Sequence, residues 1–312
     1  MTYQLIVDTD MGTDDWMALS YLSRHPAIDL VGVVVTGIGL AHLHAGTQNA
    51  LSMLDFFGQN HVPVVMGAHA PLSMSNVFPP EVRVQMDAMD NITLPKSQRA
   101  PESDDVLTFY RRTVQKYGKV RVLSIGGLTH LAQVTHTPDV YAGIERLDVM
   151  GGAIRVAGNV ADFGGYYPSN HSAEWNVFID PLAAQQTLNS GVPMRWTTLD
   201  TSYQVPFSDS LFAQLQAQAR TTEAKFVLEI MKHMDRSQFF FFDPLAAALL
   251  AEDSPTWATR ETLGLSVVQT FDEEDDHSGQ TVIDAQAPYR VDVFSQVDAA
   301  EFYQNFLSVL NT

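Results

Sequence analysis

The stretch Val7-Asp8-Thr9-Asp10-Met11-Gly12-Thr13-Asp14-Asp15 places four carboxylates within eight residues. It follows an apolar run at residues 3–7 that is typical of a buried strand, and it leads into a helix-like pattern at residues 16–22. The acids therefore lie where a strand ends and a helix begins, which is where parallel α/β sheets hold their ligands. Because four such close charges repel one another, the pattern favours a hard cation with oxygen ligands among them.

Outward from this stretch, strand-like and helix-like segments alternate, which predicts one α/β domain, residues 1–312, with a mainly parallel, Rossmann-like sheet flanked by helices. The expected strands are residues 3–7, 30–36, 62–66, 120–125, 146–150 and 194–199. The expected helices are residues 14–24, 45–57, 104–117, 128–134, 181–189, 208–218, 223–234 and 244–251. Near the end, antiparallel strands are expected at 263–271, 281–285 and 289–296, followed by a helix at 298–310.

Composition excludes several classes of function. With 18 basic and 36 acidic residues, the formal charge is −18, which argues against nucleic acid or an anionic membrane as a partner. The absence of cysteine excludes disulfides and thiolate chemistry. Neither a signal-like leader nor an apolar run of membrane-spanning length is present in this sequence. A soluble, cytoplasmic protein is therefore expected.

Two segments are expected to be long loops, residues 73–101 and residues 157–173. Such loops are often functional, and we expect residues 73–101 to form a lid that becomes more ordered with ligand. The acidic run at 272–276 is interpreted as a solvated hairpin tip. Asp-Pro-Leu-Ala-Ala occurs twice, starting at Asp180 and at Asp243, and in both copies Asp suits a helix N-cap. For Asp180, capping is the only role expected.

Taken alone, the acid cluster fits more than one chemistry. Residues 8–13 resemble the start of the haloacid-dehalogenase-type magnesium phosphatases, whose first Asp is a nucleophile. That family does not require the Asp14–Asp15 pair, and no convincing later Lys plus acidic-pair motif follows. A calcium-binding EF-hand loop would need Glu at its twelfth position, where this chain has Leu19.

The longer pattern Asp8-x-Asp10-x-Gly12-x-Asp14-Asp15 resembles the N-terminal signature of the inosine-uridine preferring nucleoside hydrolases. Other segments resemble this family in the same order, at residues 124–132, 150–153, 158–160, 173–176, 242–246 and 279–282. The resemblance implies hydrolysis of the N-glycosidic bond of ribonucleosides by a homodimer or homotetramer. Two alternatives stay open: a magnesium phosphatase of the haloacid-dehalogenase type, and a nucleoside-binding protein without catalysis.

The same resemblance implies a Ca²⁺ ion bound by the side chains of Asp10, Asp15 and Asp243 and by the backbone carbonyl of Ile125. All-oxygen coordination of this kind suits calcium. It further implies that a water molecule activated by the metal attacks the sugar, with Asp10 as general base. The sugar would pass through an oxocarbenium-like transition state.

The resemblance assigns the ribose hydroxyls to four side chains, those of Asp14, Asn159, Glu174 and Asn176. Carboxylates and amides are suited to binding neighbouring hydroxyls in fixed directions. Met150 is expected beside the sugar, Asp8 is expected to brace the loop from behind, and Trp175 is expected to pack rather than to stack on a base.

The chain departs from the family where the leaving base is expected. Many members carry His immediately before the Asp that matches Asp243, but here the residue is Phe242. Because Phe cannot donate a proton, the departing base must be assisted by aromatic stacking or by an acid from elsewhere. We expect His233 to be that catalytic acid, with Tyr166 or Tyr167 as alternatives, and Phe242 to contact the substrate. The preferred base is left open.

Overall fold

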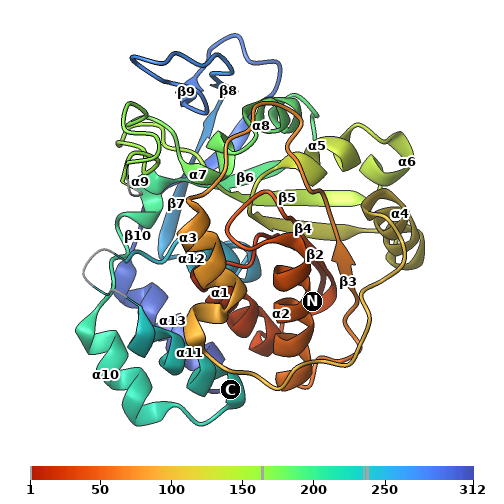
Figure 1. Ribbon diagram of the computed structural model, residues 1–312, viewed down its shortest axis with the longest axis vertical. Helices are drawn as coiled ribbons and strands as arrows, with labels where there is room; N and C mark the ends of the chain where they lie inside the picture. Colours follow the sequence, from red (N-terminus) through yellow and green to blue (C-terminus); the bar gives the residue numbers. More distant parts are fainter. Residues whose placement is uncertain (1, 163–164, 235, 237–238) are drawn as a thin grey trace.

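The centre of the computed structural model is an eight-stranded sheet with the strand order β3-β2-β1-β4-β5-β6-β10-β7 (Figure 1). The structure describes residues 2–162, 165–234, 236 and 239–312. The strands of this sheet are β1 (Tyr3–Thr9), β2 (Ile28–Val35), β3 (Val64–Met66), β4 (Val120–Ile125), β5 (Ile144–Met150), β6 (Met194–Thr197), β7 (Ala258–Leu263) and β10 (Val291–Val297). Among these strands only β7 runs antiparallel to its neighbour, so the expected mainly parallel α/β fold is confirmed.

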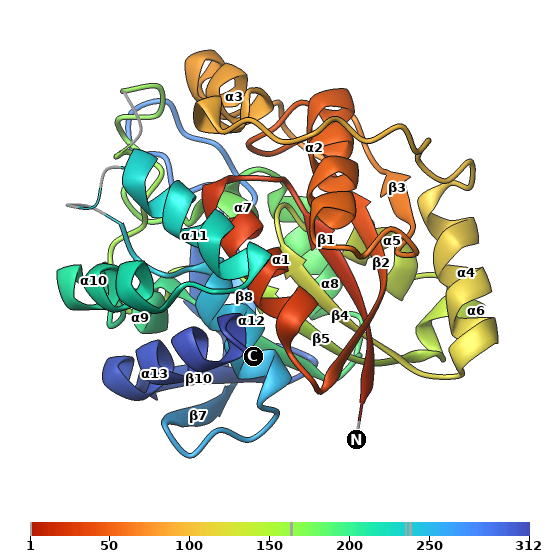
Figure 2. The ribbon, with the colours of Figure 1, turned by 90° about the horizontal axis from the view of Figure 1, so that it is seen from below.

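Helices cover both faces of the sheet (Figure 2). They are α1 (Thr13–Arg24), α2 (Leu43–Phe56), α3 (Pro80–Asp87), α4 (Val106–Tyr117), α5 (Thr129–Thr135), α6 (Pro138–Tyr141), α7 (Trp175–Phe178), α8 (Pro181–Leu188), α9 (Leu199–Ser202), α10 (Asp209–Gln218), α11 (Thr222–His233), α12 (Asp243–Ala251) and α13 (Ala299–Leu310). One core lies between the sheet and α1, α2, α11, α12 and α13, and the other lies between the sheet and α4, α5 and α8.

The first strand shows why this sheet has two covered faces. Leu5 and Val7 belong to the core on the α1 side, whereas Ile6 belongs to the core on the α4 side. Successive side chains of a strand point to opposite faces, so a continuous apolar run requires an apolar layer on each side. The strand ends at Thr9, and the acidic turn to α1 therefore lies at the carboxyl edge of the sheet.

The C-terminal strands differ in part from those expected. β7 was missed, because this strand at the edge of the sheet exposes Thr259, Arg260 and Thr262 and lacks a clear alternation of apolar residues. The expected strand 263–271 is shorter, forming β8 (Leu265–Val267), which pairs with β9 (Thr281–Ile283) in a separate two-stranded sheet. β10 is antiparallel only to β7 and lies parallel to β6.

The expectation of an irregular loop at residues 73–101 was wrong in its middle part. This segment contains α3 and a 3₁₀ helix at Met89–Asn91. A Pro-Pro pair places Pro80 in the first turn of α3, where the missing N–H is not needed. Only Met86 of this helix is fully buried, so the sequence offers little helical periodicity there. Ordering of this segment by ligand stays a prediction.

The acidic run at 272–276 is not solvated throughout. Its first four residues are exposed, but Asp276 is buried and accepts hydrogen bonds from the Asn170 side-chain amide at 2.9 Å and the Ser278 hydroxyl at 3.0 Å. The Asn170 side chain also binds the Ser278 carbonyl at 2.9 Å. Through these hydrogen bonds, Asp276 connects the loop that precedes α7 to the segment between β8 and β9.

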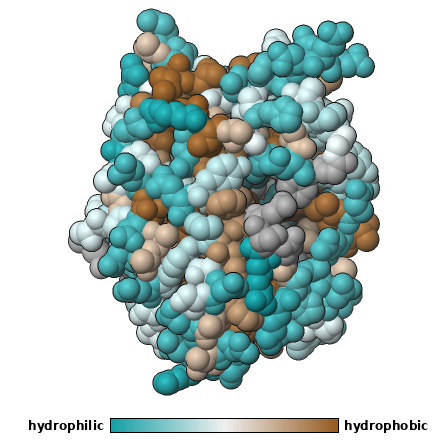
Figure 3. Space-filling view, turned by 90° about the vertical axis from the view of Figure 1, so that its left-hand side faces the viewer, coloured by the Kyte–Doolittle hydropathy of each residue, from teal (hydrophilic) through white to brown (hydrophobic). Residues whose placement is uncertain are grey.

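Hydrophilic residues predominate on the face shown in Figure 3, and hydrophobic ones gather near its upper edge and along its middle. No helix in the described part of the chain is long and apolar enough to cross a membrane.

Candidate active site

A cavity of about 780 Å³ opens at the carboxyl edge of the sheet, a size suited to a small molecule. Asp10 follows β1, Ile125 ends β4 and Met150 ends β5, so the carboxyl ends of three neighbouring strands meet at the cavity. The sequence-predicted site residues that line it are Asp10, Asp14, Asp15, Ile125, Met150, Asn159, Glu174, Asn176, Phe242 and Asp243. One local turn and several distant segments of the chain thus meet in a single cavity.

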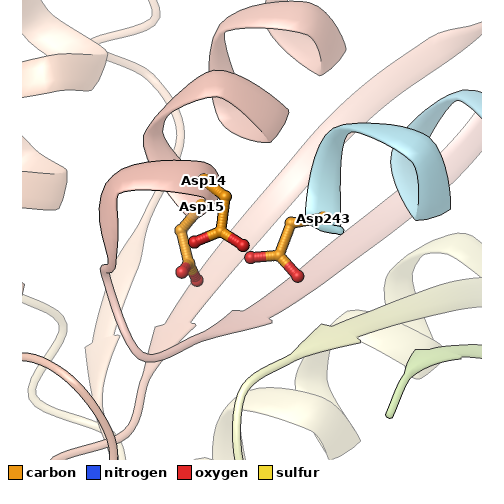
Figure 4. Close-up of side chains that lie close together, drawn as sticks. All are labelled: Asp14, Asp15 and Asp243. Carbon is orange, nitrogen blue, oxygen red and sulfur yellow. The ribbon is translucent and has the colours of Figure 1, made fainter. Parts of the chain in front are cut away.

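Three carboxylates in this cavity lie close enough to share a metal ion. Asp14 and Asp15 come from the first turn of α1 and Asp243 from the start of α12, and their side chains approach one another (Figure 4). One oxygen of each lies within 4.8 Å of the others. Packing of α1 against α12 brings them together, and both helix N-termini favour negative charge. Asp14, which was expected to bind ribose, belongs to this group, whereas Asp10, which was expected to bind the metal, does not.

Asp15 is fixed by hydrogen bonds from the turn that precedes it. Its Oδ2 accepts the N–H of Gly12 at 2.9 Å, and its Oδ1 accepts the hydroxyl of Thr9 and the N–H of Met11. Met11 has φ of 62°, a strained value for a residue with a side chain. The carboxylate of Asp15 thus offsets the strain of the turn.

Asp10 is held by the loop that follows β2. Its Oδ2 accepts the N–H of Leu40 at 3.0 Å, and its carbonyl accepts the N–H of Ala41 at 2.9 Å. At Gly39, an added Cβ would lie 1.9 Å from the same Oδ2, so only glycine allows this approach. The Gly39–Leu40 pair therefore orients Asp10 through the backbone.

Burial and mutual repulsion raise the pKa values of the acid cluster. Burial, with the charge of Asp14 adding to it, raises the pKa of Asp10 to about 7, and burial raises that of Asp14 to about 6. The pKa values of Asp15 and Asp243 lie well above the ordinary range, because burial and then neighbouring carboxylates disfavour their charge. This donor set of buried, mutually repelling oxygens fits a hard divalent cation, which would stabilise all of these charges.

Without a metal ion, the protein should lose stability as pH rises from about 4 to about 7. In the folded state the pKa values of Asp10 and Asp14 are raised from 3.8 to about 7 and about 6. The contribution of these groups to the free energy of unfolding is therefore fully present below pH 3.8, the ordinary pKa of Asp. It is lost as pH rises through the pKa values of the folded state. Thermal unfolding in chelator measures this loss. Asp243→Asn should show a shallower pH dependence, because one repelling charge is gone, and equal slopes in both proteins would contradict the explanation.

The wall expected to bind ribose is formed by interlocked polar groups. Glu174 caps α7 and accepts the N–H groups of Asn176 at 2.9 Å and of Gly152 at 2.9 Å. The Asn176 amide donates to the Met150 carbonyl at 3.1 Å, and the Asn159 side chain accepts the N–H of Trp175 at 3.2 Å. Burial raises the pKa of Glu174 to about 7. These bonds fix the directions of the polar groups before any ligand arrives.

Asp8 lies behind the site, as expected of a bracing residue. It is buried, and its Oδ2 lies 2.8 Å from Nδ1 of His130. Nε2 of His130 accepts the N–H of Ala68 at 2.7 Å, which assigns the ring proton to Nδ1. The pair connects β1, α5 and the segment after β3, a contact that no local pattern in the sequence indicates.

The structure does not bring the expected leaving-group acids to the cavity. His233 lies at the end of α11, where Nε2 contacts Oε1 of Glu229 at 3.2 Å and the side chain is 41% exposed. The Tyr166 hydroxyl donates to Glu81 at 3.0 Å, and that of Tyr167 donates to the Val77 carbonyl at 3.1 Å. None of the three is among the described residues that line the cavity. We therefore do not propose His233 as the acid that assists the leaving base.

Several cavity residues were missed in the sequence. Val82, Gln85 and Met86 come from α3, the helix that was expected to be loop, and Tyr203 follows α9. The Pro-Pro pair before α3 was the sequence signal that could have predicted this helix, which carries Val82, Gln85 and Met86. Trp175 packs as expected, with its ring stacked on Phe78 at 4.0 Å between centroids, but both residues also line the cavity.

Comparison with known proteins gives a consistent result. The family model described as inosine-uridine preferring nucleoside hydrolase matches residues 5–304. A pyrimidine-specific ribonucleoside hydrolase from Shewanella is 28% identical over 292 residues, which cover 87% of this chain and 88% of the relative. Alignments with several curated relatives span from 61% to 88% of the relative's own length.

Solved structures extend the comparison to the fold. A plant nucleoside hydrolase superposes with a TM-score of 0.86 at 21% identity, with both chains covered completely. A purine-preferring ribonucleoside hydrolase from Gardnerella vaginalis superposes with a TM-score of 0.80 at 25% identity, covering 99% of this chain and 98% of that chain. Because the family model matches nearly the whole sequence, the chain belongs to the inosine-uridine preferring nucleoside hydrolase family and is an enzyme that hydrolyses the N-glycosidic bond of nucleosides.

Proposed function

We propose that this enzyme is a calcium-dependent ribonucleoside hydrolase that releases the free base and ribose. Ca²⁺ would be held by the carboxylates of Asp10, Asp15 and Asp243 and by the carbonyl of Ile125. The observation that carries the proposal is that Asp10, Asp15 and Asp243 line the same cavity as Glu174, and that burial raises the pKa of each of these carboxylates. An all-oxygen set with one backbone carbonyl suits calcium. Because the chain belongs to the nucleoside hydrolase family, we propose this activity in place of the phosphatase alternative.

A cation in this site supplies Lewis-acid activation of the attacking water. Asp10 accepts the proton of that water as its oxygen attacks C1′ of the ribose. The Leu40 N–H at 3.0 Å keeps the Asp10 carboxylate in one orientation during this transfer. Such fixed geometry removes much of the entropic cost of bringing the reacting groups together.

The ribose would be bound by the hydroxyl ligands Asp14, Asn159, Glu174 and Asn176. These contacts accelerate the reaction only where they tighten as the sugar ring flattens towards the transition state. Glu174 accepts hydrogen bonds from two backbone N–H groups at 2.9 Å. These bonds stabilise its charged form and partly offset the cost of burying that charge. Met150 would lie beside the sugar, with its carbonyl holding the Asn176 amide.

The base would lie against the aromatic residues of the cavity, among them Phe239, Phe240 and Phe242. Flat apolar rings accept any nucleobase by stacking. Similar proteins carry names that include both pyrimidine-specific and purine-preferring hydrolases. The proposal therefore covers ribonucleosides as a class rather than one base.

A panel of ribonucleosides and their 2′-deoxy counterparts, with calcium or with chelator, tests this proposal by the release of base and sugar. Ribonucleosides should be hydrolysed, and chelator should abolish turnover until calcium is restored. The 2′-deoxy substrates should react on the order of 10- to 100-fold more slowly, because buried ligands of the missing hydroxyl stay unpaired at about 1–3 kcal/mol. Tight ribonucleoside binding without turnover would instead indicate a non-catalytic binding protein. Equal turnover of the 2′-deoxy substrates would contradict the proposed contacts to the 2′-hydroxyl.

A further inference from the structure

Tyr203 lies in the aromatic part of the cavity, beside the residue that replaces the family's histidine. It lines the cavity, and its ring lies 4.8 Å from that of Phe240 and 6.2 Å from that of Phe242, measured between centroids. A phenol at this point combines a stacking surface with one O–H donor. It can therefore supply the hydrogen bond that Phe242 cannot.

The backbone that carries Tyr203 is firmly anchored. Asp200 accepts the N–H groups of Ile154 at 2.9 Å and Arg155 at 2.8 Å. The Gln204 amide donates to the Ser295 carbonyl at 2.9 Å and its oxygen accepts the Val297 N–H at 3.1 Å, which joins this turn to β10. A donor held on a rigid support loses little entropy when it binds a substrate.

The Tyr203 hydroxyl has no hydrogen-bond partner in the described part of the chain, whereas those of Tyr166 and Tyr167 are engaged with Glu81 and Val77. Burial raises the pKa of Tyr203 to about 12, and the charges of Asp162 and Glu174 add to this effect. The phenol therefore keeps its proton across the ordinary range of enzyme assays. It is a free donor inside the cavity.

The other polar groups around the cavity are largely committed elsewhere. The Thr13 hydroxyl faces the sulfur of Met86 at 3.4 Å, and the Gln85 amide donates to Asp90 at 2.7 Å. The Asn176 amide donates to the Met150 carbonyl on the ribose side. Within the residues that the structure describes, Tyr203 is therefore the hydroxyl best placed to meet a base resting on the phenylalanine rings.

We propose that Tyr203 donates a hydrogen bond to the departing nucleobase, a role that rests on the proposed hydrolysis of ribonucleosides. As the bond from C1′ to the base nitrogen breaks, its electron pair leaves with the base. The Tyr203 O–H stabilises the negative charge that develops on a base heteroatom. C1′ bonds to the oxygen of the attacking water, whose proton goes to Asp10, and the base takes a proton from solvent water as it leaves. Asp10 then returns its proton to the solvent.

Tyr203→Phe tests this role by comparing uridine or inosine with 4-nitrophenyl β-D-ribofuranoside, whose phenolate leaves without assistance. On the natural substrate, kcat should fall on the order of 10²- to 10³-fold with KM little changed, as for loss of a donor that acts in the transition state. On the nitrophenyl riboside, the change should stay within about threefold. Retained activity on that substrate also shows that the variant is folded. Tyr167→Phe is the matched control and should leave both substrates unaffected.

Each outcome separates this inference from the proposed function. If the wild-type enzyme hydrolyses both substrates and Tyr203→Phe loses activity only on the natural one, the leaving-group role is supported. Equal losses on both substrates, or no loss on either, would overturn it while leaving the hydrolase proposal intact. Failure of the wild-type enzyme to hydrolyse either substrate in calcium would overturn the proposed function itself.

Discussion

Replacing Asp243 with asparagine should abolish both turnover and calcium-induced stabilisation while leaving the fold intact. Asp243 is buried beside Asp14 and Asp15, so its loss removes one charge from the set proposed to hold the cation. Loss of metal activation removes several kcal/mol of transition-state stabilisation, and turnover should fall on the order of 10³-fold or more. The metal-free variant should unfold at a higher temperature than the metal-free wild type, because a repelled buried carboxylate is gone.

Calcium titration followed by calorimetry and thermal unfolding would measure both effects. The chain offers a matched control in Asp180, which begins the other copy of Asp-Pro-Leu-Ala-Ala and caps α8. Asp180 binds Leu72 and Thr129 and is not among the described residues that line the cavity. Asp180→Asn should keep calcium binding and turnover. Full calcium affinity in Asp243→Asn would remove Asp243 from the metal site.

Asp10→Asn should lower kcat by on the order of 10²- to 10⁴-fold, the usual contribution of a general base. Calcium affinity should also fall, because Asp10 is one of the proposed ligands, but excess calcium should not restore turnover. Because water attack is common to all substrates, the loss should be similar for uridine and for 4-nitrophenyl riboside. This pattern differs from the substrate-selective loss expected of Tyr203→Phe.

Steady-state kinetics on both substrates, with calcium affinity measured alongside, would separate the two roles of Asp10. A variant that keeps more than about a tenth of wild-type kcat at saturating calcium would exclude Asp10 as the base. A drop in calcium affinity as large as that of Asp243→Asn, with turnover restored by excess calcium, would assign Asp10 to metal binding alone.

The sequence was a reliable guide where structure depends on local pattern. The buried strand at residues 3–7 and the helix after it appear as β1 and α1, because continuous apolar runs and helical periodicity act over a few residues. Local pattern did not predict β7 or α3, because both elements are largely exposed and contain few buried apolar residues to show a strand or helix period. The resemblance to a family supplied distant site residues such as Asp243 and Glu174, which no spacing within this chain reveals.

Local sequence pattern is sufficient to predict the mainly parallel α/β fold and the acidic turn that places Asp10, Asp14 and Asp15 at the carboxyl edge of its sheet. Which distant groups face that turn depends on tertiary packing. It brings Asp243 to the turn through the packing of α12 on α1, leaves His233 at the surface and places Tyr203 in the cavity. Contacts between distant residues depend on how whole elements pack, and periodicity within one element carries no information about its neighbour in space.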